Sequence, residues 1–199
     1  MGGQEIHLTR GVEGKVSCER QNGFLCGDIT GVQTKLPKFL KANFISRNLE
    51  TAERLKLMEV PRNNSRFTWK ITKFSSFDGE QHSSYEFTVG PRRWYLKMHP
   101  KGDLEGKENS LSLYLFASDF VSKVPVQATS AVYKLRVLDQ FKRNHHEAEI
   151  VYRFSSNDGC GQCKFLPLEE LYKASNGFLV NDAIYIGVEF LFLSTHEYL

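Results

Sequence analysis

Two cysteines separated by two residues are the strongest candidates for chemistry in this sequence. They occur in Cys160-Gly161-Gln162-Cys163, a C-x-x-C spacing that is typical of thiol–disulfide exchange and of zinc sites. Redox work requires the first thiolate at a helix N-terminus that follows a parallel strand, whereas Lys164-Phe165-Leu166 continues as a strand. We therefore interpret the two cysteines as ordinary turn thiols. A thiol redox protein built on Cys160 and Cys163 is kept as the alternative function.

A zinc site would need further ligands, and the sequence does not offer them at a suitable spacing. Cys18 and Cys26 are separated by seven residues, which is longer than the usual spacing of about two to four. His145 and His146 are adjacent, so in a strand they would point in opposite directions, and we interpret them as a solvated loop between strands. The sequence also lacks a G-x-S-x-G turn and a Gly-rich phosphate loop. We expect no metal, no cofactor and no enzymatic activity.

The charge balance argues against nucleic acid as a partner. The chain has 199 residues with 26 basic and 23 acidic side chains, which gives a net charge of +3. Divided at Pro61, the two parts carry 9 − 7 = +2 and 17 − 16 = +1. Binding through phosphate contacts normally needs a concentrated basic patch, and neither part supplies one.

The sequence gives no sign of a membrane segment. Its start, Met1-Gly2-Gly3-Gln4-Glu5, lacks the basic residues and the apolar run of a signal peptide. The longest apolar run, Ala183–Leu193, is too short to span a bilayer and contains Glu189. We expect a soluble protein of the cytoplasm and/or nucleus without a membrane partner, in which the four cysteines are free thiols.

From Ser65 onward, apolar and polar residues alternate with a period of two, which is typical of half-buried strands. The segment Leu111-Ser112-Leu113-Tyr114-Leu115, for example, places its leucines on one face. The strand candidates are 67–71, Tyr85–Val89, 94–98, 111–115, Ala131–Val137, Glu149–Phe154 and the segments around Phe165 and Ile186. About eight such strands, separated by polar turns, predict an all-β fold, an eight-stranded antiparallel β-sandwich. Pro167 predicts one short helix before the last strand.

Several motifs, taken in order, resemble the MATH (TRAF-C-like) domain family, and most closely plant proteins that contain only this domain. The resemblance covers about Arg62 to Leu193. It is carried by Phe67-Thr68-Trp69-Lys70-Ile71, His99-Pro100-Lys101-Gly102, Leu111-Ser112-Leu113-Tyr114-Leu115 and the Asn176–Asp182 segment before the last strand. The resemblance implies that residues 62–196 are a MATH domain that binds protein or peptide partners. It also implies adaptor work in ubiquitin-linked pathways.

In the family, peptide ligands lie across one sheet as an added strand, in a groove lined by aromatic side chains. The resemblance places this peptide-binding groove on five positions of this sequence, Tyr114, Tyr133, Tyr152, Cys160 and Gln162. The last two lack the aromatic rings that the family has there, so the groove cannot present the same flat apolar wall.

The alternation gives independent evidence on these positions. Tyr114 has the opposite parity to Leu111 and Leu113, so it should face away from the core, as a contact residue or as a tyrosine that is exposed or covered by a loop. Tyr133 shares parity with Leu135, which favours a core role. Tyr152 lies between apolar residues on both faces, and its parity decides nothing.

Residues 1–61 differ from the remainder and predict an N-terminal extension that is partly disordered. Within it, the spacing of apolar residues in Ser46–Val60 is compatible with a helix that is too short for a coiled-coil stalk. Asn22–Asp28 matches 176–182 in five of seven positions. The match indicates either the truncated tail of a preceding MATH repeat or a chance similarity. A degenerate fragment without function is therefore a further alternative, and the sequence leaves the oligomeric state open.

Overall fold

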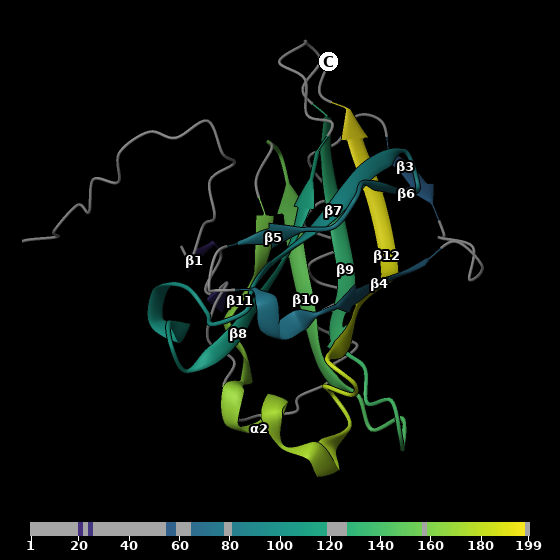
Figure 1. Ribbon diagram of the computed structural model, residues 1–199. Coiled ribbons are helices and arrows are strands. Elements are labelled where there is room, and N and C mark those ends of the chain that lie inside the picture. The colour runs from purple at the N-terminus through teal and green to yellow at the C-terminus, as the bar shows by residue number, and fades with distance from the viewer. Residues whose placement is uncertain are drawn as a thin grey trace, which may run out of the picture.

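The computed structural model describes residues 20–21, 24–25, 55–58, 65–77, 81–118, 127–156 and 159–197, and most of them form two antiparallel five-stranded sheets (Figure 1). The β12 sheet has the order β10 (His146–Phe154), β9 (Gln127–Val137), β12 (Ala183–Glu197), with β3 (Leu55–Met58) and β4 (Arg66–Thr72) both beyond β12. The β8 sheet has the order β11 (Gly159–Pro167), β8 (Ser110–Ala117), β7 (Arg92–His99), with β5 (His82–Ser83) and β6 (Phe87–Val89) both beyond β7. A separate pair joins β1 (Arg20–Gln21) to β2 (Phe24–Leu25).

The helical elements within the described residues are short. The α-helix α2 (Leu168–Tyr172) follows β11 directly, and three 3₁₀ turns, η2 (Phe74–Ser76), η3 (Leu104–Gly106) and η4 (Ala174–Asn176), lie in connections between strands. Pro167 ends β11 with an extended backbone, and the chain turns into α2 at Leu168. The short helix before the last strand is therefore confirmed, as are the all-β sandwich and its strand candidates.

The prediction of a helix over Ser46–Val60 is wrong where the structure describes it. Leu55–Met58 form β3, which pairs with Leu193–His196 of β12. Pairing with a distant strand decides the conformation here, because a weak local periodicity is easily overridden by tertiary contacts. The remainder of that segment lies outside the described residues. The interpretation of Asn22–Asp28 as a repeat remnant stays a prediction, since only Phe24–Leu25 of it are described.

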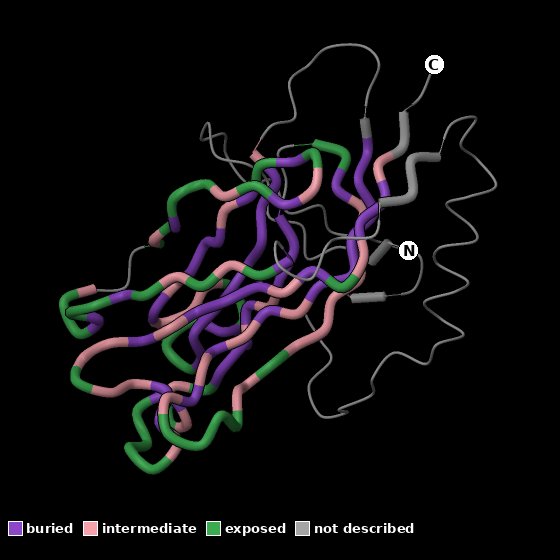
Figure 2. The backbone as a smooth tube through the Cα atoms, turned by 90° about the vertical axis from the view of Figure 1, so that its right-hand side faces the viewer, coloured by how far each residue is buried: buried purple, intermediate pink, exposed green. Residues whose placement is uncertain are grey.

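The inner faces of the two sheets bury a continuous hydrophobic core (Figure 2). Trp94 is fully buried at its centre, with its ring centroid 4.9 Å from that of Phe154 and 5.0 Å from that of Phe190. The indole N–H donates a hydrogen bond of 3.0 Å to the carbonyl of Val89. Because Phe154 and Phe190 belong to the opposite sheet, Trp94 joins the two layers and also satisfies its one polar atom.

The turn before β12 is held by side chains from two other parts of the chain. Asp182 accepts hydrogen bonds of 2.8 Å from the backbone N–H and from the hydroxyl of Ser75 in η2. Gln140, which follows β9, donates its side-chain amide to the carbonyls of Phe178 and Ala183 at 3.1 and 3.0 Å. Gly177 adopts a positive φ of 69° at the end of η4, a conformation that favours glycine. Gly177 of this motif is therefore explained by backbone geometry, and Asp182 by the hydrogen bonds of its carboxylate to Ser75.

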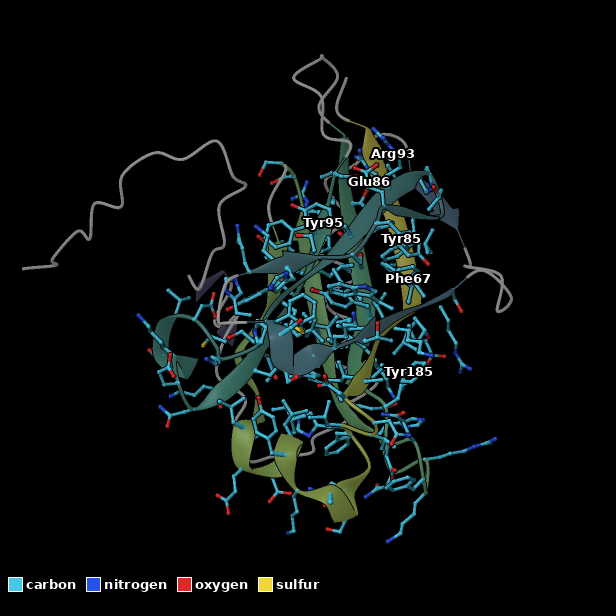
Figure 3. The ribbon with its side chains drawn as sticks, in the orientation of Figure 1. Phe67, Tyr85, Glu86, Arg93, Tyr95 and Tyr185 are labelled. Carbon is cyan, nitrogen blue, oxygen red and sulfur yellow. The ribbon has the colours of Figure 1, made fainter. Side chains whose placement is uncertain are left out.

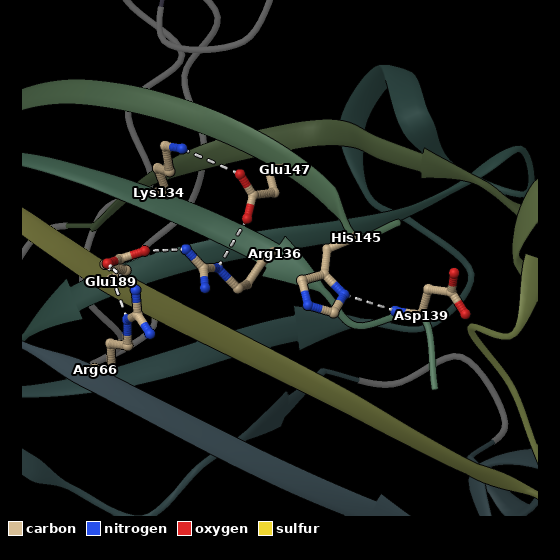
Figure 4. A network of polar contacts seen from close by, with 7 residues as sticks. All are labelled: Arg66, Lys134, Arg136, Asp139, His145, Glu147 and Glu189. Carbon is tan, nitrogen blue, oxygen red and sulfur yellow. Dashed lines mark hydrogen bonds and ion pairs between the residues drawn. The ribbon is translucent and has the colours of Figure 1, made fainter. Parts of the chain in front are cut away.

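A row of charged side chains crosses the outer face of the β12 sheet (Figure 4). Glu189 on β12 accepts from Arg66 on β4 at 2.6 Å and from Arg136 on β9. Arg136 also pairs with Glu147 on β10 at 3.3 Å, and Glu147 pairs with Lys134 at 3.1 Å. Burial by itself would raise the pKa of Glu189, but the hydrogen bonds from Arg66 and Arg136 hold that pKa below its ordinary value.

Replacing Trp94 tests the central role of its ring in the core. We expect Trp94→Ala to lower the free energy of unfolding by about 3–5 kcal/mol, because a large buried side chain is lost and a cavity remains. Tyr172→Ala removes a side chain that is 54% exposed and should change the free energy of unfolding by about 0.5 kcal/mol or less. Urea denaturation followed by tryptophan fluorescence or circular dichroism measures both. Similar losses in the two variants would contradict the assignment.

The charged row makes a separate prediction about acid stability. The ordinary pKa of glutamate is 4.5, and that of Glu189 is lower in the folded protein. The stabilisation from this carboxylate is therefore complete above about pH 4.5 and is lost as pH falls through the lower folded pKa. We expect Glu189→Gln to be less stable than the wild type at pH 7 and to lose less further stability between about pH 5 and 3.

The control for this experiment is Glu86→Gln. Glu86 pairs with Arg93 at 3.0 Å, and both side chains are about half exposed, at 47% and 56%. Exposed pairs contribute little to stability, so this variant should follow the wild-type pH profile closely. A Glu189→Gln profile that also overlays the wild type would show that the charged row does not contribute.

Candidate functional site

One edge of the sandwich is formed by the terminal strands of both sheets, β10 and β11, and we call it the β10–β11 edge. Two side chains connect the sheets there. The Tyr133 hydroxyl donates to the carbonyl of Cys160 at 2.7 Å. His146 Nε2 lies 2.6 Å from the carbonyl of Phe165, and because a carbonyl only accepts, this nitrogen carries the proton. These two hydrogen bonds join the sheets along this edge, and we call the line between β10 and β11 the seam.

Strand register decides which predicted site residues face this seam. Tyr152 lies opposite Ala131 and Ile150 lies opposite Tyr133, so both tyrosines are on the inner face of the β12 sheet. In the other sheet, Cys160 lies opposite Leu115 and Gln162 opposite Leu113. Because Leu113 and Leu115 are core residues, Cys160 and Gln162 are also on the inner face. The fold thus directs Tyr152 of β10, Cys160 and Gln162 of β11, and Tyr133 of the adjacent strand β9 to the inner faces of the two sheets.

These four residues differ in the solvent exposure of their side chains. Tyr133 is fully buried in the core, which confirms the role that its parity predicted. Cys160 is also buried. Tyr152 and Gln162 are half-buried, and the ring of Tyr152 packs edge-on against Phe154 at a centroid distance of 4.9 Å. A ligand at this seam would therefore touch Tyr152 and Gln162 first.

Tyr114 lies on the outer face of the β8 sheet, away from the other four. Its outward direction is confirmed, since it packs in a cluster separate from the main core. It is only 1% exposed, however, so an openly accessible contact residue is not what the structure shows. Its hydroxyl donates to Asp103 at 2.8 Å, and its ring lies edge-on to His99. Asp103 immediately precedes η3, so a loop covers this tyrosine.

Two glycines of β11 are closely packed against β8 on the outer face, Gly159 by the ring of Phe116 and Gly161 by the backbone of Leu113 and Tyr114. Gly159 is opposite Phe116 and Gly161 is opposite Tyr114 in the register. A Cβ added at Gly159 would lie 2.4 Å from Phe116 Cε2, so the ring occupies the space that a side chain would need. Tyr95 stacks on Phe116 at 5.1 Å, and Lys97 Nζ lies 4.6 Å from the centroid of the same ring. The glycines of the C-x-x-C region are therefore explained by packing.

The cysteines do not form a redox unit. Cys163 is a free, buried thiol, and burial raises its pKa, with the charges of Asp103 and Glu105 acting in the same direction. Such a thiol is a poor nucleophile near neutral pH. Cys160 is disulfide-bonded, so the expectation of a free thiol is wrong there, and the bond is not to Cys163. Both residues lie in strand β11, which corrects the interpretation as turn thiols.

The two histidines also differ from the expected solvated loop. His146 begins β10 and is partly buried against Phe165, with ring centroids 5.1 Å apart. His145 Nδ1 accepts a hydrogen bond of 3.1 Å from the backbone N–H of Asp139. Sequence reasoning missed the role of His146, and only its place within the apolar alternation of β10 could have indicated it. Burial lowers the pKa of His146, although its hydrogen bond to Phe165 acts in the opposite direction.

The described parts of the chain contain neither a cluster of metal ligands nor a helix that could cross a membrane. No group of three or more His, Cys, Asp or Glu side chains is placed there to hold a metal ion. Helices in these same residues are too short and too polar to cross a bilayer.

With this geometry established, comparison with known proteins identifies the class of the fold. A family model described as MATH domain matches residues 66–190. The chain therefore belongs to the MATH domain family, whose fold is a protein-interaction module. A solved structure, TRAF5 of Notothenia coriiceps, has a similar fold with a TM-score of 0.53, 24% identity, and coverage of 77% of this chain and 83% of that one.

Curated plant proteins show the same domain within longer chains. Ubiquitin C-terminal hydrolase 12 of Arabidopsis thaliana is 33% identical over 126 residues, which cover 62% of this chain and 11% of that protein. A MATH domain and coiled-coil domain-containing protein of the same plant is 33% identical over 126 residues, covering 62% of this chain and 45% of that protein. The similarity thus spans less than half of either relative, and it concerns the MATH domain.

The seam residue His146 predicts a pH dependence of stability. The ordinary histidine pKa is 6.5, and that of His146 is lower in the folded protein. The unfolded chain therefore takes up a proton first, and stability falls as pH decreases from about 6.5 towards the folded pKa. We expect His146→Gln, which can still donate to the Phe165 carbonyl, to lose less stability than wild type between pH 7.5 and 5.5. Urea denaturation at several pH values measures this, and identical wild-type and variant slopes would contradict it.

Proposed function

We propose that this chain binds an extended peptide of a partner protein as an added strand at the β10–β11 edge. The observation that carries the proposal is the register that sets Tyr152, Gln162 and Cys160 on one side of two neighbouring sheet ends. Strand addition obtains affinity from main-chain hydrogen bonds and specificity from alternate side chains in pockets. The membership of the MATH family supports the same mode of binding.

Each site residue has a different role in this proposal. Tyr152 presents a half-buried ring with a polar hydroxyl, which suits a contact residue. The Gln162 amide can both donate and accept hydrogen bonds, so the groove is more polar than an aromatic one. Tyr133 forms the floor through its bond to the Cys160 carbonyl, and Tyr114 supports β11 from the outer face. With few exposed aromatic anchors, we expect a Kd of about micromolar.

The cellular role that we propose is adaptor work in ubiquitin-linked pathways, in the cytoplasm and/or nucleus. One of the related proteins is itself named a ubiquitin C-terminal hydrolase, and its similarity to this chain lies in the MATH domain. A domain of this kind would bring a partner to other machinery through binding alone. This proposal requires no chemistry from the described residues.

A selection from a displayed peptide library on the wild-type chain tests the site. We expect the selected peptides to lose at least about tenfold in affinity for Tyr152→Ala, since an anchoring ring is worth more than about 1.4 kcal/mol. Gln162→Ala should change which peptides are preferred. The measurement is fluorescence anisotropy with labelled peptides, and circular dichroism confirms the fold of each variant.

The matched control is Tyr172→Ala, which removes an exposed tyrosine from α2. Its affinity for the selected peptides should stay within about twofold of wild type. Peptides that bind the wild type, Tyr152→Ala and Gln162→Ala equally would show that the β10–β11 edge is not the binding site.

A further inference from the structure

The strand β4 lies at the opposite edge of the β12 sheet, and its backbone geometry can be derived from one hydrogen bond. The backbone N–H of Phe190 donates to the carbonyl of Ser65 at 2.8 Å, in register with Arg66 opposite Glu189. Hydrogen-bonded and non-bonded pairs alternate in an antiparallel ladder. The N–H and C=O groups of Arg66, Thr68 and Lys70 therefore point away from β12, towards the outer edge of the sheet.

Within the described residues, neither a proline nor a bulge interrupts this edge, so its charged side chains are the protection against unwanted pairing that remains. β4 has seven residues without proline, and its register with β12 is unbroken. Within the described residues it pairs with β12 alone. In contrast, the neighbouring edge of the β8 sheet is divided into the short strands β5 and β6. A long, regular edge strand is a template for another strand.

Aromatic rings lie beside this edge (Figure 3). Phe67 of β4 stacks on Phe87 of β6 with centroids 3.9 Å apart, and Tyr85 lies edge-on to Phe67 at 5.2 Å. Tyr85 is 69% exposed. The rings close the gap between the two sheets and leave one aromatic surface open to an apolar side chain from outside.

The charges on β4 decide what kind of strand can pair with it. Arg66 and Lys70 are exposed and share the outer face of the β12 sheet, with Thr68 between them. Antiparallel pairing of two copies centred on Thr68 would set each Arg66 opposite Lys70 of the second copy, and like charges directly opposite are destabilising. A strand with carboxylates at those positions would instead form two cross-strand ion pairs.

We propose that the outer edge of β4 is a second docking site, which takes an acidic extended segment of a partner protein as an antiparallel strand. In a five-residue core of that segment, residues one and five are Asp or Glu, opposite Lys70 and Arg66. Residues two and four are apolar and face the side of Phe67 and Tyr85. This site is separate from the β10–β11 edge and does not depend on the proposed function.

The probe is a synthetic peptide with Glu-Val-Thr-Val-Glu at its centre, titrated into the ¹⁵N-labelled full chain and followed by NMR chemical shifts. We expect shifts centred on 66–72 and Tyr85. Thr68→Pro removes an N–H that points away from β12, so it should weaken binding at least about tenfold while the ladder remains. The matched control Thr68→Val keeps the N–H and should bind within about twofold of wild type. Thermal melts establish that both variants are folded.

Charge-reversal variants provide a second test of the proposal. Lys70→Glu should lower the affinity for the acidic peptide at least about fivefold and raise the affinity for a peptide with Lys-Val-Thr-Val-Lys at its centre. The control Lys142→Glu, in the exposed loop after β9, should change neither affinity. Arg66 is left in place because it also pairs with Glu189. Shifts centred on Tyr152 and Gln162 would overturn the proposal in favour of the β10–β11 edge. Equal binding to Thr68→Pro and Thr68→Val, or no binding to the wild type, would also overturn it.

Discussion

The burial of one face of each sheet against the other is the constraint on which the remaining structure depends. Alternating apolar residues must be covered, and rings such as Trp94, Phe154 and Phe190 fill the space between the layers. Because side chains alternate between the two faces of a strand, burial of the inner residues also determines which residues point outward. The charged row from Arg66 to Lys134 and the outward Tyr114 both follow from this geometry.

A sandwich of this kind has two open sides, and in this chain they differ in character. At the β10–β11 edge, polar links through Tyr133 and His146 tie the sheets together. At the side of β4, aromatic stacking between Phe67 and Phe87 closes the gap. The first side has polar links between the sheets, and the second has a basic strand beside the exposed ring of Tyr85. The two proposed docking sites would therefore be chemically distinct surfaces of one domain.

The sequence predicts the strands well because each carries its own period-two pattern, and it predicts the direction of Tyr114 for the same reason. It does not predict that Asp103 and the η3 loop cover Tyr114, because loop paths leave no periodic trace. The spacing in Ser46–Val60 is compatible with a helix where the structure has β3, because the conformation of β3 depends on β12, far along the chain. The sequence does not predict that the His146 side chain points inward, because two adjacent polar residues resemble a loop. Long-range contacts decide all three cases.

The glycines beneath Phe116 and Tyr114 also bear on how the domain can diversify. Because a ring or the neighbouring backbone already fills the place of any side chain at Gly159 and Gly161, the outer side of β11 leaves no room for a larger residue at these two positions. The two residues that alternate with these glycines, Cys160 and Gln162, point inward, so in this part of the strand only the inward face can change. Under the proposed function, variation at Gln162 would alter ligand preference on the side of the strand that borders the seam, while the packing over the two glycines stays intact.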